Sequence, residues 1–369
     1  MLLKSFSVQN YKNFKEKFVL NLADVRDYKF NKESTIDGVV KTGVIYGKNS
    51  VGKTNFGYAI FDITYHIIDK MRMIEPTQYY VNADSKSDVA NFEYCFTDDN
   101  GNDILYFYQK KGSYDMVKES LMVNGEPWFE YDFEGKNGSF EGLKRIPELK
   151  ELNLHFKDNG MSFIRFLANN SRLPADNPII ELYQFVSKML WFNSIDNSNN
   201  FIGFKASADD ILDYVIRNKL IEDLNDFLQD NGVDEKLVCE VTPDKKKVLY
   251  FKHKTLLPYA LASSGTKSLL LFFYWYQQIS LASFVYIDEF DAFYHFELAE
   301  KVLKLAMKAS GQVLLTSHNT NLLSNKIMRP DCYFILTKDK ITSFANATAR
   351  ELREGHNLEK LFISGEFNG

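Results

Sequence analysis

Residues 47–54 constrain the fold of this chain most narrowly, because they read G-x-x-x-x-G-K-T. The glycine at each end lets the backbone curl until successive N–H groups point inward at a phosphate. Lys53 would bring a positive charge to the β- and γ-phosphate oxygens, and Thr54 would offer its hydroxyl to Mg²⁺. The pattern predicts a nucleoside triphosphate site built from Gly47, Lys48, Asn49, Ser50, Val51, Gly52, Lys53 and Thr54.

The sequence on both sides of this loop has the character that a phosphate-binding loop requires. Residues 43–46 form a short apolar run, which predicts a buried strand. Residues 56–70 carry apolar side chains at helical spacing, which predicts a helix whose N-terminus points at the anion. A glycine-containing turn could match the loop pattern by chance. Because strand, loop and helix occur in the required order, we favour a P-loop.

Composition is that of an ordinary globular protein and gives little support to several other functional classes. The 369 residues carry 44 Lys and Arg against 49 Asp and Glu, a net charge of −5. This balance does not indicate DNA binding, although a local basic groove stays open. Three widely spaced cysteines, outside any C-x-x-C, favour a reducing cytoplasm over disulfides or a zinc site.

Nothing in the sequence predicts insertion into a membrane. The N-terminus lacks the long apolar core of a signal peptide. The most apolar stretch, residues 269–276, is much shorter than the ~20 residues that cross a bilayer. We therefore expect a cytoplasmic protein with no membrane partner.

The predicted secondary structure changes in character twice along the chain, which suggests three segments. Residues 1–142 are rich in strand patterns, including two strands within residues 2–22 that we expect beside the P-loop strand. Residues 143–232 have helical spacing and are predicted to form an inserted lobe or lid. Residues 233–369 alternate strands and helices, which indicates a parallel sheet with both faces covered. The predicted fold class is α/β, a P-loop NTPase core with a mixed or parallel sheet and an inserted helical lobe.

Two strands in the last third of the chain lead into side chains suited to catalysis. Residues 284–287 are apolar and precede Asp288 and Glu289, whose carboxylates should emerge at the carboxyl edge of the sheet. There Asp288 could hold Mg²⁺, and Glu289 could polarise the attacking water. The next strand leads to His318, whose neutral imidazole could bond the γ-phosphate. Alternatively, Asp288 and Glu289 could form a solvated acidic turn, and His318 could be only a polar residue at the end of a strand. The presence of a P-loop favours the catalytic interpretation of all three residues.

Residues 261–267 (L-A-S-S-G-T-K) lie just ahead of a predicted buried helix. Ser263, Ser264 and Gly265 could place hydroxyl and backbone N–H donors at the N-terminus of that helix, where they would form a second anion site. A simple serine N-cap explains the segment equally well. The residues of this segment alone leave both interpretations open.

The order of these motifs resembles that of ATP-binding-cassette (ABC) ATPases. In that family, the segment matching Ser263–Thr266 is the signature motif, which caps the γ-phosphate of an ATP held by a second subunit. The resemblance therefore implies that Ser263 and Gly265 contact ATP. Residues 6–14 (F-S-V-Q-N-Y-K-N-F) are similar to the opening strand of RecF- and SMC-like ATPases, in which the residue matching Lys12 reaches the phosphates.

Further segments are similar to soluble bacterial ATPases of the abortive-infection type, related to the OLD family. They are residues 117–121, 191–192, 263–267 and 356–367. The resemblance implies ATP and Mg²⁺ as ligands, hydrolysis of ATP to ADP and phosphate, and a homodimer or higher homo-oligomer that sandwiches ATP. It also implies a nucleotide-gated dimerisation switch, the sensor or regulator subunit of an anti-phage system with a separately encoded effector, a nuclease or toxin.

Some positions depart from the ABC pattern or stay unassigned. No glutamine is clearly placed for the Q-loop: Gln109 lies in a suitable β region, and Glu119 could take the equivalent place. The residues after Glu289 would form the D-loop, which faces the partner subunit, with Asp291 and His295 as candidates. Two other functions remain open. One is a RecF/SMC-like DNA-repair ATPase, which would need a basic groove, and the other is an ATP-gated scaffold that holds a protein partner.

Overall fold

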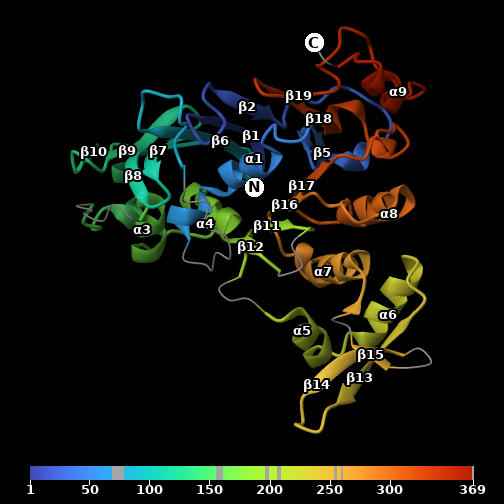
Figure 1. The fold of residues 1–369 in the computed structure, drawn as a ribbon. Coiled ribbons are helices and arrows are strands. Elements are labelled where there is room, and N and C mark those ends of the chain that lie inside the picture. The colour runs from blue at the N-terminus through green and yellow to red at the C-terminus, as the bar shows by residue number, and fades with distance from the viewer. Residues whose placement is uncertain are drawn as a thin grey trace.

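The computed structural model describes residues 1–68, 79–154, 161–195, 199–205, 209–252, 256–258 and 261–367. These residues form a mixed α/β structure around two seven-stranded sheets, one largely parallel and one antiparallel (Figure 1). The predicted α/β class with a P-loop NTPase core is confirmed. Among the described residues, no helix combines the length and the apolar character needed to cross a membrane.

The largely parallel sheet carries the P-loop. Its strand order is β12-β11-β16-β17-β5-β18-β19, and the five strands from β11 to β18 run parallel. Every residue of its three central strands is buried, as expected for a sheet covered on both faces. The strands are β5 (Thr42–Tyr46), β11 (Met189–Asn193), β12 (Phe201–Gly203), β16 (Phe284–Asp288), β17 (Gln312–Ser317), β18 (Tyr333–Leu336) and β19 (Ile341–Ser343).

The antiparallel sheet has the order β10-β9-β8-β7-β6-β1-β2. Buried and less buried residues alternate along β6, so one face of that strand packs into the core. The strands are β1 (Leu2–Gln9), β2 (Phe18–Asn21), β6 (Ala90–Thr97), β7 (Asp103–Gly112), β8 (Asp115–Val123), β9 (Glu126–Asp132) and β10 (Asn137–Ser139).

The two N-terminal strands differ from the prediction. They were expected beside the P-loop strand, but β1 pairs with β6 and therefore belongs to the antiparallel sheet. Alternation of apolar residues identifies a half-buried strand but does not name its neighbour. Side chains on β1 contact the helix that follows the P-loop, α1 (Lys53–Phe61).

Helix α1 lies between the two sheets (Figure 1). On one side, the ring of Phe56 lies 5.8 Å from that of Phe6 on β1. On the other side, a side chain at Gly57 would come within 2.7 Å of the Tyr286 ring and 2.8 Å of Trp191 Nε1. The predicted helix 56–70 is in fact divided into α1 and α2 (Thr64–Ile67), and its last two residues lie outside the described residues.

The segment predicted as a helical lobe, 143–232, contains helices but also contributes strands to the core. The apolar run Met189–Phe192 lies in β11, because four consecutive buried residues suit a strand covered on both faces. Helices α3 and α4 precede it and pack near α2, whereas α5 and α6 follow it. The three-part division of the chain stays a prediction. The helices are α3 (Phe163–Asn170), α4 (Pro178–Ser187), α5 (Ile211–Arg217) and α6 (Ile221–Asp230).

A separate lobe projects below the parallel sheet in Figure 1. It combines α5 and α6 with the strands β13 (Lys236–Val241), β14 (Lys247–Lys252) and β15 (Leu256–Pro258). Both helices contact α7. The remaining elements are α7 (Ser264–Ile279), α8 (Phe296–Ala306), α9 (Leu358–Ile363), β3 (Thr35–Ile36), β4 (Val39–Val40) and the 3₁₀ helices η1 (Lys32–Ser34), η2 (Leu143–Arg145), η3 (Pro147–Leu149), η5 (Thr320–Leu322) and η6 (Pro330–Cys332).

Candidate functional site: the carboxyl edge of the parallel sheet

The P-loop connects β5 to α1, as its sequence predicts. Gly52 is the N-cap of α1 with φ of 102°, a conformation that L side chains rarely adopt, and a side chain there would collide with Asn13. A side chain at Gly47 would come within 2.8 Å of the backbone oxygen of Leu336. Asn13 Nδ2 donates to the backbone oxygen of Val51 at 3.2 Å, so the N-terminal turn supports the loop.

Lys12 lies in that same N-terminal turn, one residue before the asparagine that contacts the P-loop. Its backbone has φ of 46°, in the left-handed region. Burial lowers the pKa of its amine. The family resemblance implies that Lys12 contacts the nucleotide phosphates. Because Lys12 is next to Asn13, which contacts the P-loop, we retain this contact as a proposal.

Lys53 is held at the mouth of the P-loop. Its side chain is almost buried, and its Nζ donates to the backbone oxygen of Gly47 at 3.2 Å and lies 2.7 Å from His318 Nε2. Burial lowers the pKa of the amine, against the pull of Glu289 and Asp288. A charged lysine can only donate, so His318 Nε2 must accept and the imidazole must be neutral. Burial and the charge of Lys53 accordingly lower the pKa of His318.

Asp288 lies at the end of β16, fully buried, and is surrounded by donors from three other elements. Its Oδ2 accepts from Thr54 Oγ1 at 2.7 Å and from Asn193 Nδ2 at 3.3 Å. Its Oδ1 accepts from Thr316 Oγ1 at 2.7 Å. Burial raises the pKa of Asp288, and the hydroxyls of Thr54 and Thr316 oppose that rise.

The pairing of Thr54 with Asp288 is the arrangement that a magnesium nucleotide would need. Both offer oxygen, the ligand type that Mg²⁺ prefers, and their oxygens meet at one point in the structure. Within the described part of the chain, no group of three or more His, Cys, Asp or Glu side chains is arranged to hold a metal ion. Thr54 and Asp288 together fit an ion that is also held by the phosphates of a nucleotide.

Glu289 directly follows the buried strand and adopts the left-handed conformation, with φ of 51°. Its backbone N–H donates to Thr316 Oγ1 at 2.7 Å, so one threonine fixes both adjacent acids. Glu289 Oε1 lies 3.6 Å from His318 Nε2. Lys53, Glu289 and His318 thus converge as the sequence predicted, from α1 and the ends of two neighbouring strands.

Asp291 and His295 follow in the predicted D-loop. Asp291 Oδ2 accepts from Ser317 Oγ at 2.6 Å, next to His318, and burial raises the pKa of this carboxyl to about 6. His295 has a helical role, because it is the N-cap of α8 and its Nδ1 accepts from the backbone N–H of Leu298 at 3.3 Å.

The signature segment lies at the N-terminus of α7, on the surface. Ser263 is the N-cap, and its Oγ accepts from the Thr266 N–H at 3.1 Å, while Ser263 and Ser264 are both exposed. Ser268 Oγ lies 2.9 Å from Tyr294 OH. A side chain at Gly265 would lie 3.4 Å from the backbone oxygen of Phe293. The signature segment and the D-loop therefore pack against each other.

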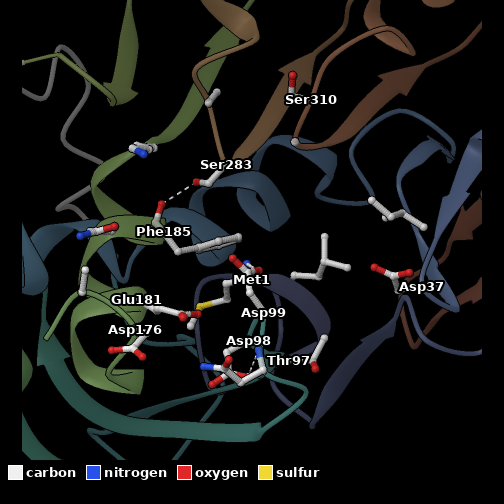
Figure 2. A pocket seen from close by; sticks show the side chains of 18 of the residues that line it. Met1, Asp37, Thr97, Asp98, Asp99, Asp176, Glu181, Phe185, Ser283 and Ser310 are labelled. Atoms are coloured by element: carbon white, nitrogen blue, oxygen red, sulfur yellow. Dashed lines mark hydrogen bonds and ion pairs between the residues drawn. The ribbon is translucent and has the colours of Figure 1, made fainter.

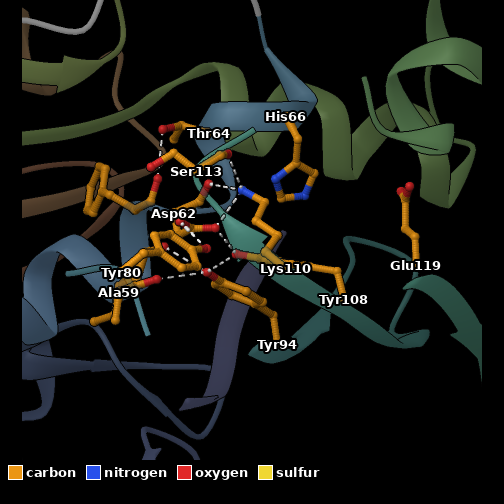
Figure 3. Close-up of polar contacts among 12 residues, drawn as sticks. Ala59, Asp62, Thr64, His66, Tyr80, Tyr94, Tyr108, Lys110, Ser113 and Glu119 are labelled. Carbon is orange, nitrogen blue, oxygen red and sulfur yellow. Dashed lines mark hydrogen bonds and ion pairs between the residues drawn. The ribbon is translucent and has the colours of Figure 1, made fainter. Parts of the chain in front are cut away.

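Both candidates for the Q-loop position lie on the antiparallel sheet and not at the carboxyl edge of the parallel sheet. Gln109 Nε2 donates to Asn91 Oδ1 at 2.8 Å. Glu119 is fully buried and accepts from the backbone N–H groups of Phe163 at 2.6 Å and Ile164 at 3.2 Å, at the start of α3. In Figure 3, Glu119 lies apart from the cluster around Asp62.

Asn193 is one residue of this site that the sequence reasoning missed. It ends β11, directly opposite Asp288 in the parallel pairing, and its amide bonds the aspartate. The signal was present, because a polar residue follows a short apolar run here just as it does in β16. It was lost because residues 143–232 were assigned as a helical segment.

A cleft lies at the opposite edge of the parallel sheet (Figure 2). It has a volume of about 960 Å³ and is lined by residues 280–283, 310–311 and 188, which precede β16, β17 and β11. Its other lining includes Asp37, Asp98, Asp99, Asp176 and Glu181. These carboxylates would repel a nucleotide triphosphate. The candidate nucleotide site is therefore at the carboxyl edge.

The fold and the geometry of this edge define the chain as a P-loop NTPase. The chain belongs to the family described as "AAA domain, putative AbiEii toxin, Type IV TA system", whose model matches residues 44–324. This membership confirms the predicted ATPase class of the abortive-infection type. No protein of curated function matches the chain.

Solved structures similar to the chain come from the predicted RecF/SMC-like branch. An SMC head domain from Thermotoga maritima matches at 14% identity and a TM-score of 0.43, covering 93% of this chain and 99% of that one. A Pyrococcus furiosus Smc head bound to the C-terminal domain of ScpA matches at 13% and 0.45, covering 100% of both chains. The recombination mediator RecF with ATP matches at 12% and 0.41, covering 92% and 98%.

Proposed function

We propose that this chain binds ATP with Mg²⁺ at the P-loop and hydrolyses it to ADP and phosphate. The observation that carries the proposal is the convergence of Lys53, Thr54, Asp288, Glu289 and His318 at one edge of the parallel sheet. Thr54 and Asp288 would hold Mg²⁺, which would neutralise phosphate charge when bound with ATP. Lys53 would leave His318 and bind the β- and γ-phosphates.

Glu289 and His318 would act on the reacting atoms in this proposal. Glu289 would orient the attacking water and accept its proton, and the neutral His318 would donate to the γ-phosphate. The neutral state of His318 is supported by its contact with the Lys53 amine. In ATP-bound protein, departure of Lys53 towards phosphate would free Nε2, and the neutral imidazole in its Nε2–H tautomer could then donate to the γ-phosphate.

We further propose that a second copy of the chain completes the site, so that ATP acts as a dimerisation switch. Ser263 and Ser264 are exposed at the N-terminus of α7, where a nucleotide held by a second subunit could reach their hydroxyls. The large apolar side chains of Leu261, Phe293 and Phe296 are 73%, 38% and 51% exposed beside this motif or at the D-loop. Large apolar side chains left exposed near the signature segment and the D-loop are compatible with a protein contact there.

The biological role we propose is that of the sensor or regulator subunit of an anti-phage abortive-infection system. The description of the family as a putative AbiEii toxin in a type IV TA system supports this setting. The effector would be encoded separately, as a nuclease or a toxin. Cytoplasmic location is part of the same proposal.

The decisive variant is Glu289→Gln, which keeps the size of the side chain and removes its basicity. We expect ATP affinity to stay within about threefold of the parent and turnover to fall about 10²-fold or more, because the general base is lost. With ATP and Mg²⁺, the variant should accumulate as a dimer in light scattering. Glu130→Gln on the exposed face of β9 removes the same charge and should behave as the parent.

Each outcome bears on a separate part of the proposal. Turnover of the Glu289→Gln variant within tenfold of the parent would remove Glu289 from the mechanism. A variant that binds ATP but stays monomeric at every protein concentration would contradict the shared site. Absence of ATP binding by the parent chain would sink the function as a whole.

A further inference from the structure

The short helix η5 begins two residues after His318 and is held in place by two side chains from distant parts of the chain. Tyr46 OH donates to the backbone oxygen of Asn319 at 3.2 Å. Thr320 Oγ1 donates to Glu359 Oε1 on α9 at 3.1 Å. The chain directly following His318 is therefore fixed from the P-loop strand on one side and from the C-terminal helix on the other.

Tyr46 also connects α9 to the P-loop, because it is the residue immediately before Gly47. Its buried ring lies 6.1 Å from the ring of Phe362 on α9 and 6.2 Å from that of Phe344. Phe344 and Phe362 stack at 5.7 Å with an angle of 7° between the rings. Helix α9 thus contacts the segments that lead to both Lys53 and His318.

The tail that carries α9 is firmly anchored to the rest of the protein. Asn325 Nδ2 donates to the backbone oxygens of Arg353 at 2.9 Å and His356 at 3.1 Å, just before α9. After α9, Phe367 is buried and lies 4.3 Å from Phe344, ring to ring. This tail lies beyond residue 324, where the match to the family model ends.

We propose that α9 is a positioning element for ATP hydrolysis, which sets His318 against the P-loop through Glu359 and Phe362. The proposal rests on the ATPase function proposed above. Lys53 and His318 are 2.7 Å apart but come from strands whose loops could move independently. A shared support behind both loops would keep the imidazole aligned with the γ-phosphate, and small misplacements of a catalytic group are costly.

The test removes one hydrogen bond at a time without touching a catalytic residue. Thr320→Val deletes the hydroxyl that reaches Glu359, and Tyr46→Phe deletes the hydroxyl that reaches Asn319. We expect kcat to fall about tenfold in each, since each loses a hydrogen bond that orients the loop, with nucleotide affinity within twofold of the parent. Thr320→Ser and Glu359→Gln keep a donor and an acceptor respectively, and both should retain kcat within twofold.

A second readout separates positioning from general stability and does not depend on turnover. The chain has six histidines, so the imidazole signals of ¹³C-labelled protein can be followed by NMR, with His318→Gln used for assignment. In nucleotide-free protein, Thr320→Val and Tyr46→Phe should shift the His318 signal and its titration, whereas Thr320→Ser should not.

The outcomes distinguish this inference from the proposed function. If the parent chain fails to hydrolyse ATP, the proposed function fails, and the NMR comparison still tests the support of His318. If turnover is normal in the parent, and Thr320→Val keeps kcat within twofold with an unmoved His318 signal, then α9 has no positioning role. Tyr46→Phe tests only the direct hydrogen bond from the P-loop strand to Asn319. A lowered melting temperature with unchanged kcat would likewise reduce α9 to a structural support.

Discussion

Among the residues that the structure describes, two lysines are buried, and their surroundings differ in one decisive respect. Lys110, on β7, is fully buried, and its Nζ donates to Asp62 Oδ1 at 2.7 Å and to the backbone oxygen of Ser113 at 3.0 Å (Figure 3). Lys53 is 6% exposed, and its amine contacts the Gly47 carbonyl and the neutral imidazole of His318. The first charge faces a carboxylate, and the second contacts neutral groups.

The carboxylate that neutralises Lys110 is itself satisfied from several sides. Asp62 directly follows α1, and its carboxylate also accepts from Tyr80 OH at 2.8 Å and Tyr108 OH at 3.0 Å. Tyr94 OH donates to two backbone oxygens in the last turn of α1, those of Ala59 and Ile60, at 3.1 Å each. This network ties the end of the P-loop helix to the antiparallel sheet.

The comparison teaches how a buried charge can be assigned to folding or to function. A cation with a complete set of partners specifies one packing arrangement, and removal of a single partner is costly. A cation that is desolvated but contacts only neutral groups has its charge available for an anion that arrives later. We therefore expect the two lysines to respond oppositely to the same substitution.

Lys110→Met should produce the largest effect on stability. It leaves Asp62 buried without its cation, so the free energy of unfolding should fall by about 3–5 kcal/mol, measured by urea denaturation. ATP affinity of the folded fraction should change little. The double variant Asp62→Asn/Lys110→Met should recover part of the loss, because neither charge remains. A large loss of ATP affinity without loss of stability would place Lys110 in the functional class.

Lys53→Met should act on turnover and leave stability intact. We expect ATP turnover to fall about 10²- to 10³-fold, because an electrostatic contact to the transferring phosphoryl group is lost. The free energy of unfolding should not fall, since a desolvated cation has been removed. Lys86→Met, at an exposed position, is the matched control. A destabilisation as large as that of Lys110→Met would abolish the distinction between the two lysines.

The nucleotide edge could be predicted from sequence because its signals are local. In a parallel sheet, the ends of neighbouring strands meet at one edge, so a P-loop, Asp288-Glu289 and His318 had to converge once each strand was recognised. Asn193 escaped because its strand lies inside a segment with helical texture, 95 residues from its partner Asp288. The Lys110–Asp62 ion pair was not predicted, because the pattern of residues in a strand does not indicate which distant acid a buried lysine will contact.

Glu119 provides another test of the comparison between the two lysines, with a smaller expected effect on stability. It is fully buried like Lys110, but the partners that hold its carboxylate are neutral donors, namely two backbone N–H groups at the start of α3 and Tyr106 OH at 3.0 Å. Burial raises the pKa of Glu119 from 4.5 to about 7, and these donors oppose the rise. Because its hydrogen-bond partners are neutral, Glu119 is more similar to Lys53 than it is to Lys110.

The sign of the resulting pH dependence follows from the raised pKa. Between pH 4.5 and about 7, native Glu119 retains a proton that the unfolded chain has lost, so stability falls as the pH rises through this window. Glu119→Gln cannot titrate, and its stability relative to the parent should therefore increase across the window by on the order of 1–3 kcal/mol. The measurement is urea denaturation at several pH values, with Glu130→Gln on the adjacent strand as control.

The difference between variant and parent isolates Glu119, because the raised pKa values of Asp288 and Asp291 and the lowered pKa of His318 are common to both proteins. Parallel curves for Glu119→Gln and the parent from pH 4.5 to 7 would mean that native Glu119 is ionised throughout. Three neutral donors, two of them at a helix N-terminus, would then compensate a buried carboxylate as fully as Asp62 compensates Lys110. In that case, the charge of its partner would no longer tell whether a buried ionisable residue serves folding or function. The catalytic role of Lys53 would then be inferred only from its position in the P-loop.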